Sequence, residues 1–213
     1  MTVFFTSDTH FGEARILRAA KRPFATIAEH DEHLKRGWNE TVGEDDEIWH
    51  LGDVGIAPGP DGMTALLEAL HGRKHLIIGN NDGPKTLASP AWASVQHYTE
   101  LRLDHDDFGL DQSKVMNVID SNQLERDAGG KPVPTFPHPA RREVHCILCH
   151  YAFRTWNQMG KGSIDLHGHS HVMLKELTRQ FDVGVDAWNY RPVTLEAMLA
   201  SRKRGKAKSA AGA

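Results

Sequence analysis

The sequence predicts an α/β fold, because short hydrophobic runs typical of strands alternate with amphipathic segments typical of helices. The runs at residues 2–7, 47–51 and 74–78 each end at polar residues that can bind metal ions or substrates. In α/β sheets ligands bind at the carboxyl ends of the strands, so we expect a functional site there. The chain has 213 residues, 39% hydrophobic and 25% charged, which suits a globular protein with a substantial core.

The first strand is expected at residues 2–7, a β-branched and aromatic run. A short helix should follow and end before Pro23. Thr26 and Glu29 are spaced as a capping box, which predicts the start of a second helix.

The next elements repeat this alternation. A strand at 47–51 leads into a loop rich in glycine and proline. A helix is expected at 63–70, because its leucines recur at helical spacing. The following strand, at 74–78, ends at a Gly-Asn-Asn-Asp sequence.

The second half begins with one strand expected over residues 95–103. Residues 105–142 are polar, with a Gly-Gly pair and several prolines, and a loop of that length is usually functional or mobile. Strands are expected at 144–148 and near 181–185. Thr194 is expected to cap a last helix.

We expect one domain over residues 1–200, with 105–142 as an inserted loop or lobe, since neither a repeat nor a second core is visible. Residues 201–213 form a basic segment, interpreted as a solvated, flexible tail or alternatively as a weak anchor for nucleic acid or phosphate. The net charge of −3 argues against a protein-wide nucleic-acid surface. Because no signal peptide or membrane span is visible, we expect a cytoplasmic protein in which Cys146 and Cys149 are reduced.

The most distinctive stretch is Leu-His-Gly-His-Ser-His at residues 166–171. In an extended segment alternate residues point to the same side, so His167, His169 and His171 are expected to line one surface. Neutral imidazole is the commonest metal ligand in proteins. For this stretch by itself, a polar loop without a metal is an equal alternative.

The strand ends and the histidine run together supply a mixed nitrogen and oxygen ligand set: Asp8, His10, Asp53, Asn80, His150, His169 and His171. The set is large enough for two divalent metal ions. A carboxylate can bridge two ions about 3.5–4 Å apart, and such pairs activate water and bind phosphoryl oxygens. Because the set contains no thiolate, Mn is the first choice, with Fe, Zn, Ni or Co as alternatives.

The ordered motifs Asp-x-His, Gly-Asp, Gly-Asn, His and Gly-His-x-His resemble those of the calcineurin-like metallophosphoesterases. The resemblance covers roughly residues 3–193 and is greatest to small bacterial and phage-like members. It implies a four-layer α-β-β-α sandwich, in which two mixed sheets are flanked by helices.

The resemblance also implies a role for each ligand. It assigns one metal ion to Asp8, His10, Asp53 and His171. It assigns the other ion to Asp53, Asn80, His150 and His169, so that Asp53 bridges the pair. A hydroxide between the ions would then attack phosphorus in line.

Two departures from the family pattern refine the expected activity. Asn81 stands where the family usually has a histidine that protonates the leaving oxygen, and asparagine has no titratable proton. We therefore expect a phosphodiesterase in which Asn81 is both the catalytic residue beside the metals and a substrate contact, with a phosphomonoesterase or a non-catalytic metal-dependent interaction protein as alternatives. Ile56 and Ala57 stand where protein serine/threonine phosphatases have Asp and Arg, so that activity is not expected.

Other residues have two interpretations each. Arg154 could bind a substrate phosphate or form a structural ion pair. His50 and His167 could orient ligands or be structural, and Trp156 and Trp188 could stack on a base or belong to the core. The expected partner is a phosphate-ester substrate, nucleotides and nucleic acids included; no membrane is expected, and self-association stays open.

Overall fold

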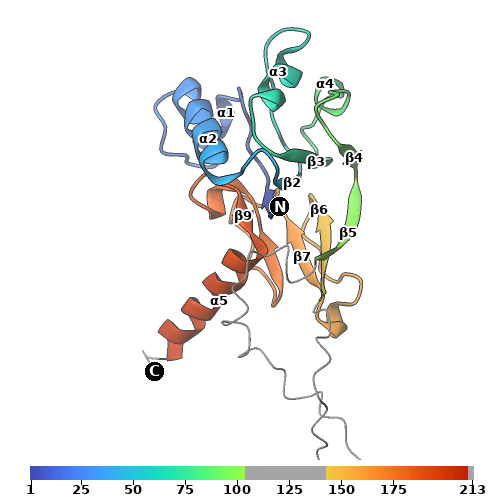
Figure 1. Ribbon diagram of the computed structural model, residues 1–213. Coiled ribbons are helices and arrows are strands. Elements are labelled where there is room, and N and C mark those ends of the chain that lie inside the picture. Colours follow the sequence, from blue (N-terminus) through green and yellow to red (C-terminus); the bar gives the residue numbers. More distant parts are fainter. Residues whose placement is uncertain (104–142, 211–213) are drawn as a thin grey trace, which may run out of the picture.

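The computed structural model describes residues 1–103 and 143–210, which form two mixed β-sheets with helices packed against them (Figure 1). The α/β class predicted from the sequence is thus confirmed. The expected insertion at 105–142 lies outside the described residues. Within the described part, no helix has the length and hydrophobicity needed to cross a membrane.

The first sheet has five strands in the order β4-β3-β2-β1-β9. Their bounds are β1 (Val3–Thr6), β2 (Glu47–His50), β3 (Arg73–Ile77), β4 (Ser94–Gln96) and β9 (Val193–Thr194). Strands β1 to β4 are parallel, with Phe4 beside Ile48 in the register, and β9 is antiparallel to β1. The carboxyl ends of β1, β2 and β3 therefore lie at the same edge.

The second sheet has four strands in the order β5-β6-β7-β8. Their bounds are β5 (Tyr98–Leu103), β6 (Val144–Cys149), β7 (Ile164–His167) and β8 (Gln180–Asp182). Strand β5 is antiparallel to β6, whereas β6, β7 and β8 are parallel.

The α-helices are α1 (Arg15–Ala19), α2 (Ile27–Thr41), α3 (Gly62–Glu68), α4 (Pro84–Leu87) and α5 (Leu195–Ala210). Figure 1 shows α1 to α4 gathered on the side of the first sheet that faces away from β6 and β7. In the described part of the chain two 3₁₀ turns also form, η3 (Met159–Lys161) and η4 (Val185–Ala187). Half of the predicted capping box is present: the Glu29 N–H donates to Thr26 Oγ1 (3.2 Å), but the Glu29 carboxylate accepts from the Ala25 N–H (3.0 Å) and not from that of Thr26.

Alternating strand residues divide the core in two. Phe5 and Leu148 belong to the layer between the sheets, whereas Ile48 belongs to the layer between the first sheet and helices α2 and α3. Because successive strand side chains point to opposite faces, one strand serves both layers. Cys146 lies in the layer between the sheets, and it and Cys149 are free thiols, as predicted.

The prediction of a single strand over residues 95–103 is wrong in one respect. The segment forms two strands, β4 and β5, which belong to different sheets and are separated at His97. This corner carries the chain from the first sheet to the second. Neither glycine nor proline marks the corner, so the sequence gives no local signal for it.

The carboxyl-terminal helix α5 packs against β1 and β9. It extends to Ala210, through most of the segment 201–213 for which the sequence indicates a flexible tail. Lysine, arginine and alanine dominate this segment, and all three are good helix formers.

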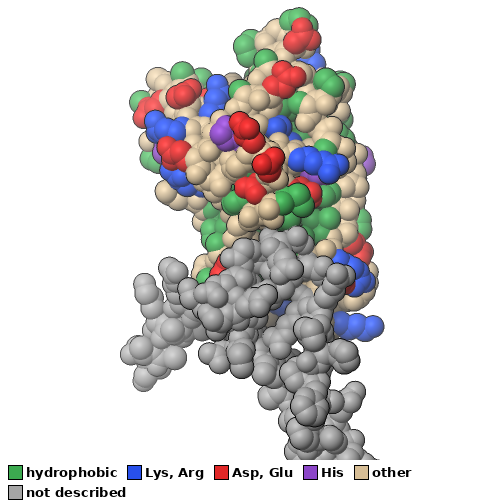
Figure 2. Space-filling model, in the orientation of Figure 1, with side chains coloured by type: hydrophobic (Ala, Val, Ile, Leu, Met, Phe, Trp, Pro, Cys, Tyr) green, Lys and Arg blue, Asp and Glu red, His purple; other side chains and the backbone are tan. Residues whose placement is uncertain are grey.

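Figure 2 shows one face of the molecule, on which acidic and basic side chains are interspersed over the part that holds α1 to α4. This mixture agrees with the small net charge of the whole sequence. The face in view therefore offers no broad region of one sign that would bind a polyanion.

Candidate metal centre

The carboxyl ends of strands from both sheets meet and bring the seven candidate ligands together. A backbone bridge joins the sheets here, where the Val185 N–H donates to the Ser7 carbonyl (3.0 Å). Six of the seven residues form two clusters, and within each cluster the ligand atoms lie within 4.8 Å of one another. The first cluster is Asp8, His10 and His171, and the second is Asp53, His150 and His169. Each cluster could hold a divalent cation.

Asp53 lies between the two clusters. Its Oδ2 is 3.6 Å from His10 Nε2, in the first cluster, and 3.6 Å from His150 Nε2, in its own. The seventh candidate, Asn80, directs Oδ1 to within 3.0 Å of His150 Nε2. One carboxylate is thus in reach of both clusters, which is the arrangement that a bridging ligand requires.

His10 has the properties expected of a metal ligand. Its side chain is buried, and within the described residues neither ring nitrogen has a hydrogen-bond partner. The nearest carboxylate oxygens, of Glu13 and Asp53, are 3.5 and 3.6 Å away. Burial lowers the pKa of His10 to about 4, so its ring is neutral and its lone pair is free at neutral pH. Buried polar atoms without a partner are rare in proteins, and a metal ion would satisfy this one.

The two aspartates differ in their electrostatics. Burial raises the pKa of Asp8 to about 8, although nearby His171 opposes this shift. Burial also favours a higher pKa for Asp53, but hydrogen bonds from the Asn81 backbone (2.8 Å) and side chain (2.7 Å) keep that pKa below its usual value. Asp53 is therefore ionised at neutral pH, and a cation at the first cluster would ionise Asp8 as well.

The backbone is unusual at the ligands themselves. Five of the seven have a positive φ, between 44° and 63°: Asp8, His10, Asp53, His169 and His171. Residues other than glycine seldom adopt this conformation, although Asp and His tolerate it better than most. Gly168 permits the close approach of the sheets, because a side chain there would collide with Ser7 and Asp8.

A buried ion pair holds His171 in position. Asp186 Oδ2 lies 2.7 Å from His171 Nδ1, which leaves Nε2 directed toward Asp8 at 4.0 Å. The fully buried guanidinium of Arg22 donates to both oxygens of Asp186 (2.9 and 2.8 Å) and to the Asp8 carbonyl (2.6 Å). Carboxylates that accept from a ligating histidine fix its tautomer and orientation. Sequence reasoning missed both Arg22 and Asp186 as parts of the site.

The second cluster has its own supports. His150 Nδ1 lies 2.7 Å from the Leu51 carbonyl, which directs Nε2 toward Asp53 and Asn80. The Asp82 carboxylate accepts from the backbone N–H groups of Gly79 (2.7 Å) and Asp53 (3.0 Å), so it joins the loops that follow β3 and β2. Asp82 was also missed, although its position directly after the Gly-Asn-Asn sequence was a possible signal.

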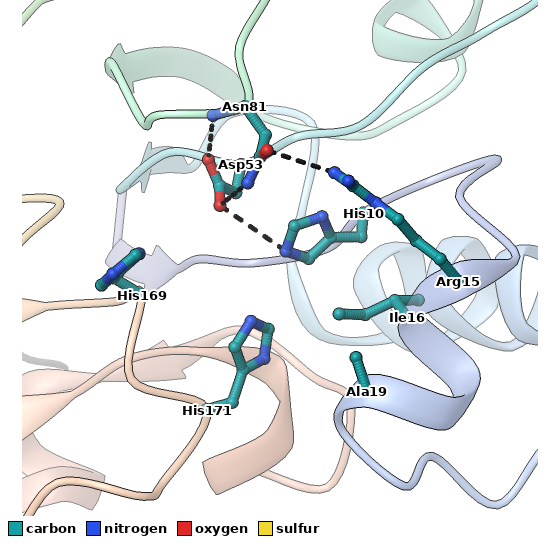
Figure 3. Close-up of a pocket in the computed structure, with 8 residues that line it drawn as sticks. All are labelled: His10, Arg15, Ile16, Ala19, Asp53, Asn81, His169 and His171. Carbon is teal, nitrogen blue, oxygen red and sulfur yellow. Dashed lines mark hydrogen bonds and ion pairs between the residues drawn. The ribbon is translucent and has the colours of Figure 1, made fainter.

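The clusters open into a cleft of about 300 Å³ (Figure 3). Helix α1 forms one wall through Arg15, Ile16 and Ala19. Arg15 Nη2 donates to Asn81 Oδ1 (3.1 Å), so a cationic and an amide side chain lie side by side at the cleft, as Figure 3 shows. The Arg15 side chain is 70% exposed, and the sequence offered no signal for it beyond its closeness to His10. The cleft thus combines two possible cation sites with donors suited to an anion.

The histidine run is not extended, so the expectation that its three histidines line one surface is confirmed for two of them only: His169 and His171 line the cleft, whereas His167 does not. Strand β7 ends at His167, and the positive φ angles of His169 and His171 turn the chain so that these two enter different clusters. His167 is buried, with Nδ1 2.9 Å from the Gly168 carbonyl. His50 is buried too and contacts Thr9 Oγ1 (2.9 Å), between Asp8 and His10.

The remaining candidates lie outside the cleft. Arg154 is exposed and does not line it. Trp156 and Trp188 direct their ring N–H groups to the backbone carbonyls of Ser163 (3.2 Å) and Asp182 (2.8 Å). These contacts favour the core interpretation of both tryptophans.

Comparison with known proteins gives two phage relatives that match most of the chain and whose names state no activity. The chain is 32% identical over 197 residues to the Gene 66 protein of Mycobacterium phage D29, a match that covers 88% of this chain and 89% of that protein. It is 30% identical over 191 residues to the Gene 66 protein of Mycobacterium phage L5, covering 87% and 86% of the two chains. No protein-family model matches.

Among solved structures, a protein of unknown function from Aquifex aeolicus has a similar fold. The TM-score is 0.57 at 15% sequence identity, and the alignment covers 92% of this chain and 96% of that one. At this level of identity the similarity concerns the fold alone.

Proposed function

The chain belongs to the family of the mycobacteriophage Gene 66 proteins, and we propose that it is a dinuclear metal-dependent phosphoesterase, more specifically a phosphodiesterase. Under this proposal its fold is the four-layer calcineurin-like sandwich, and its substrates are phosphate esters, nucleotides and nucleic acids included. The two ions are divalent, with manganese the first choice for a set of nitrogen and oxygen ligands.

One observation carries the proposal, namely the position of Asp53 between the two clusters. Its Oδ2 is equally far, 3.6 Å, from an imidazole nitrogen of each cluster. A single isolated cation would need only one of these clusters. A shared carboxylate supports a pair of ions that act together on one substrate.

The seven candidate ligands divide into two sets, one for each ion, with Asp53 in both. Asp8, His10, Asp53 and His171 would hold one ion, and Asp53, Asn80, His150 and His169 the other. When bound, such a pair activates water as a nucleophile and stabilises the charge that develops on phosphoryl oxygens.

Two side chains in the cleft are suited to bind the substrate itself. The Arg15 guanidinium can donate to a phosphoryl oxygen, and its hydrogen bond to Asn81 Oδ1 (3.1 Å) orients both groups. The amide of Asn81 can donate a hydrogen bond but has no titratable proton to give to a leaving group. This favours esters whose leaving group departs without strong protonation.

The test is hydrolysis of bis(4-nitrophenyl) phosphate and of 4-nitrophenyl phosphate by the manganese-loaded protein. We expect turnover of both, with a higher kcat/KM for the diester, and loss of turnover in Asp53→Asn. Asp45→Asn is the matched control and should keep full activity, since Asp45 is exposed in the turn before β2, at the opposite end of that strand from Asp53.

Two results would overturn the proposal. A higher kcat/KM for the monoester would identify a phosphomonoesterase. A protein that binds two manganese ions and hydrolyses neither compound would instead be a metal-dependent interaction protein.

A further inference from the structure

A second cleft of about 540 Å³ adjoins the metal cleft, and Asn81 lines both. One wall comes from the loop after β2, with Ile56 and Ala57, and from Met63 of α3. The opposite wall comes from the start of α4, with Lys85 and Thr86. Of the residues that line this cleft, only Asn81 is part of the metal centre; the side chains of the others do not hydrogen-bond to a candidate ligand.

The lining of this cleft indicates what it can bind. Its residues are mostly apolar or glycine, and Ile56 leaves 60% of its surface exposed. Lys85 is the one charged side chain in the lining, which contains no acidic residue. Clefts of this size with apolar walls and few polar groups are typical of sites for small organic molecules. The cleft therefore suits an apolar ring with neutral or anionic substituents and disfavours a cationic group.

The walls are fixed relative to the metal clusters. The Ile56 N–H donates to the Phe11 carbonyl (2.8 Å), and Phe11 directly follows the candidate ligand His10. Gly55 permits this contact, since any side chain there would collide with the Phe11 backbone. On the other wall, Lys85 Nζ donates to the Gly59 carbonyl (3.2 Å) of the same loop. These contacts thus fix both walls of the cleft, which lowers the entropic cost of binding a ligand there.

We propose that this second cleft binds an aromatic ester group of the substrate while the phosphoryl group lies in the metal cleft. The inference rests on the proposed function, since it assumes a phosphate ester at the metals. The ester group would extend from the metal cleft into the second cleft beside Asn81, which lines both, and its ring would pack against Ile56 and Met63. Lys85 at the rim would attract a further anionic substituent. The preferred substrates would then be esters that carry a ring of at least phenyl size, rather than short alkyl esters.

Binding of phosphonates tests this without turnover, because the carbon–phosphorus bond is not hydrolysed. We expect the manganese-loaded protein to bind phenylphosphonate roughly ten-fold or more tightly than methylphosphonate in isothermal titration, since burial of a ring of this size favours binding by that order. Ile56→Ser should remove most of this preference and leave the affinity for methylphosphonate unchanged. Leu199→Ser, which replaces an exposed leucine on α5, is the matched control and should keep the preference.

Equal affinity for the two phosphonates in the native protein would overturn the inference, and so would a preference that survives in Ile56→Ser. If methylphosphonate binds and the diester is hydrolysed, such a result refutes the second cleft alone. If neither phosphonate binds and the diester is not hydrolysed, the proposed function fails and the inference fails with it.

Discussion

Replacing Asp186 with Asn should weaken metal binding at the first cluster and leave the second nearly unchanged. Asp186 accepts three hydrogen bonds, one from His171 and two from Arg22, at 2.7 to 2.9 Å. Asparagine has one acceptor oxygen, so its NH₂ group would face a donor from one of these partners. His171 would then lose the charged acceptor that fixes its orientation.

The size of the effect follows from these contacts. Loss of the group that orients a ligating histidine typically costs 10- to 100-fold in metal affinity, or about 1.4 to 2.7 kcal/mol. The Arg22 guanidinium is fully buried, so Asp186→Ala would also leave a buried charge without its partner. Such a loss usually destabilises a protein by about 3–5 kcal/mol. The asparagine variant is the better probe, because it keeps the volume and part of the hydrogen bonding.

Equilibrium dialysis against manganese, followed by elemental analysis, would give the affinity of each site. Asp165→Asn is the matched control, since Asp165 is a buried carboxylate that accepts from Gln180 and Phe153 on the outer side of the second sheet. Equal loss of both ions in Asp186→Asn, or no loss of either, would refute the assignment of Asp186 to the first cluster.

Three further predictions follow from the same geometry. Asp53→Asn should lose both metal ions, whereas Asp8→Asn should lose mainly one; two ions retained in the Asp53 variant would contradict the bridge. Asn81→His should raise activity on esters with poor leaving groups by roughly 10²- to 10⁴-fold, since a well-placed general acid contributes that much; a native enzyme insensitive to leaving-group pKa would contradict this. Because the pKa of Asp8 is raised to about 8, a proton must leave when the first ion binds, so its affinity should fall about ten-fold per pH unit below about pH 8. Asp53 has a lowered pKa, so the affinity for the second ion should depend less on pH. Two affinities that fall in parallel with pH, measured by dialysis across this range, would contradict this difference.

The sequence predicted the strands and helices well where hydrophobic periodicity is strong. Buried residues fill β1 and all but the first position of β2 and β3, and Thr26 and Thr194 cap helices as expected from their local sequence. The corner at His97 was missed because alternation continues on both sides of it. Only the pairing of β4 with β3 and of β5 with β6 separates the two strands, and those contacts are distant in the chain.

The candidate ligands were predictable because each follows a strand, whereas their supports were not. Arg22 and Asp186 are 164 residues apart, and no local pattern pairs them. Arg15 reaches Asn81 across 66 residues of sequence. Such contacts depend on how the loops fold back over the strand ends, which hydrophobic periodicity does not encode.

The backbone at the site gives an argument for function that is independent of any resemblance. Five candidate ligands have a positive φ, and a residue other than glycine in that conformation costs of order 1–3 kcal/mol. Even at the lower end, the sum is comparable with the net stability of a typical domain, about 5–15 kcal/mol. Glycine would relieve this strain at each position, but it has no side chain to offer a cation. Eleven described residues other than glycine have a positive φ, and these five lie together at the strand ends, where binding of metal ions to the folded state would offset their cost. These five strained positions, the unpartnered nitrogens of buried His10 and the shared carboxylate of Asp53 all lie within the same two clusters.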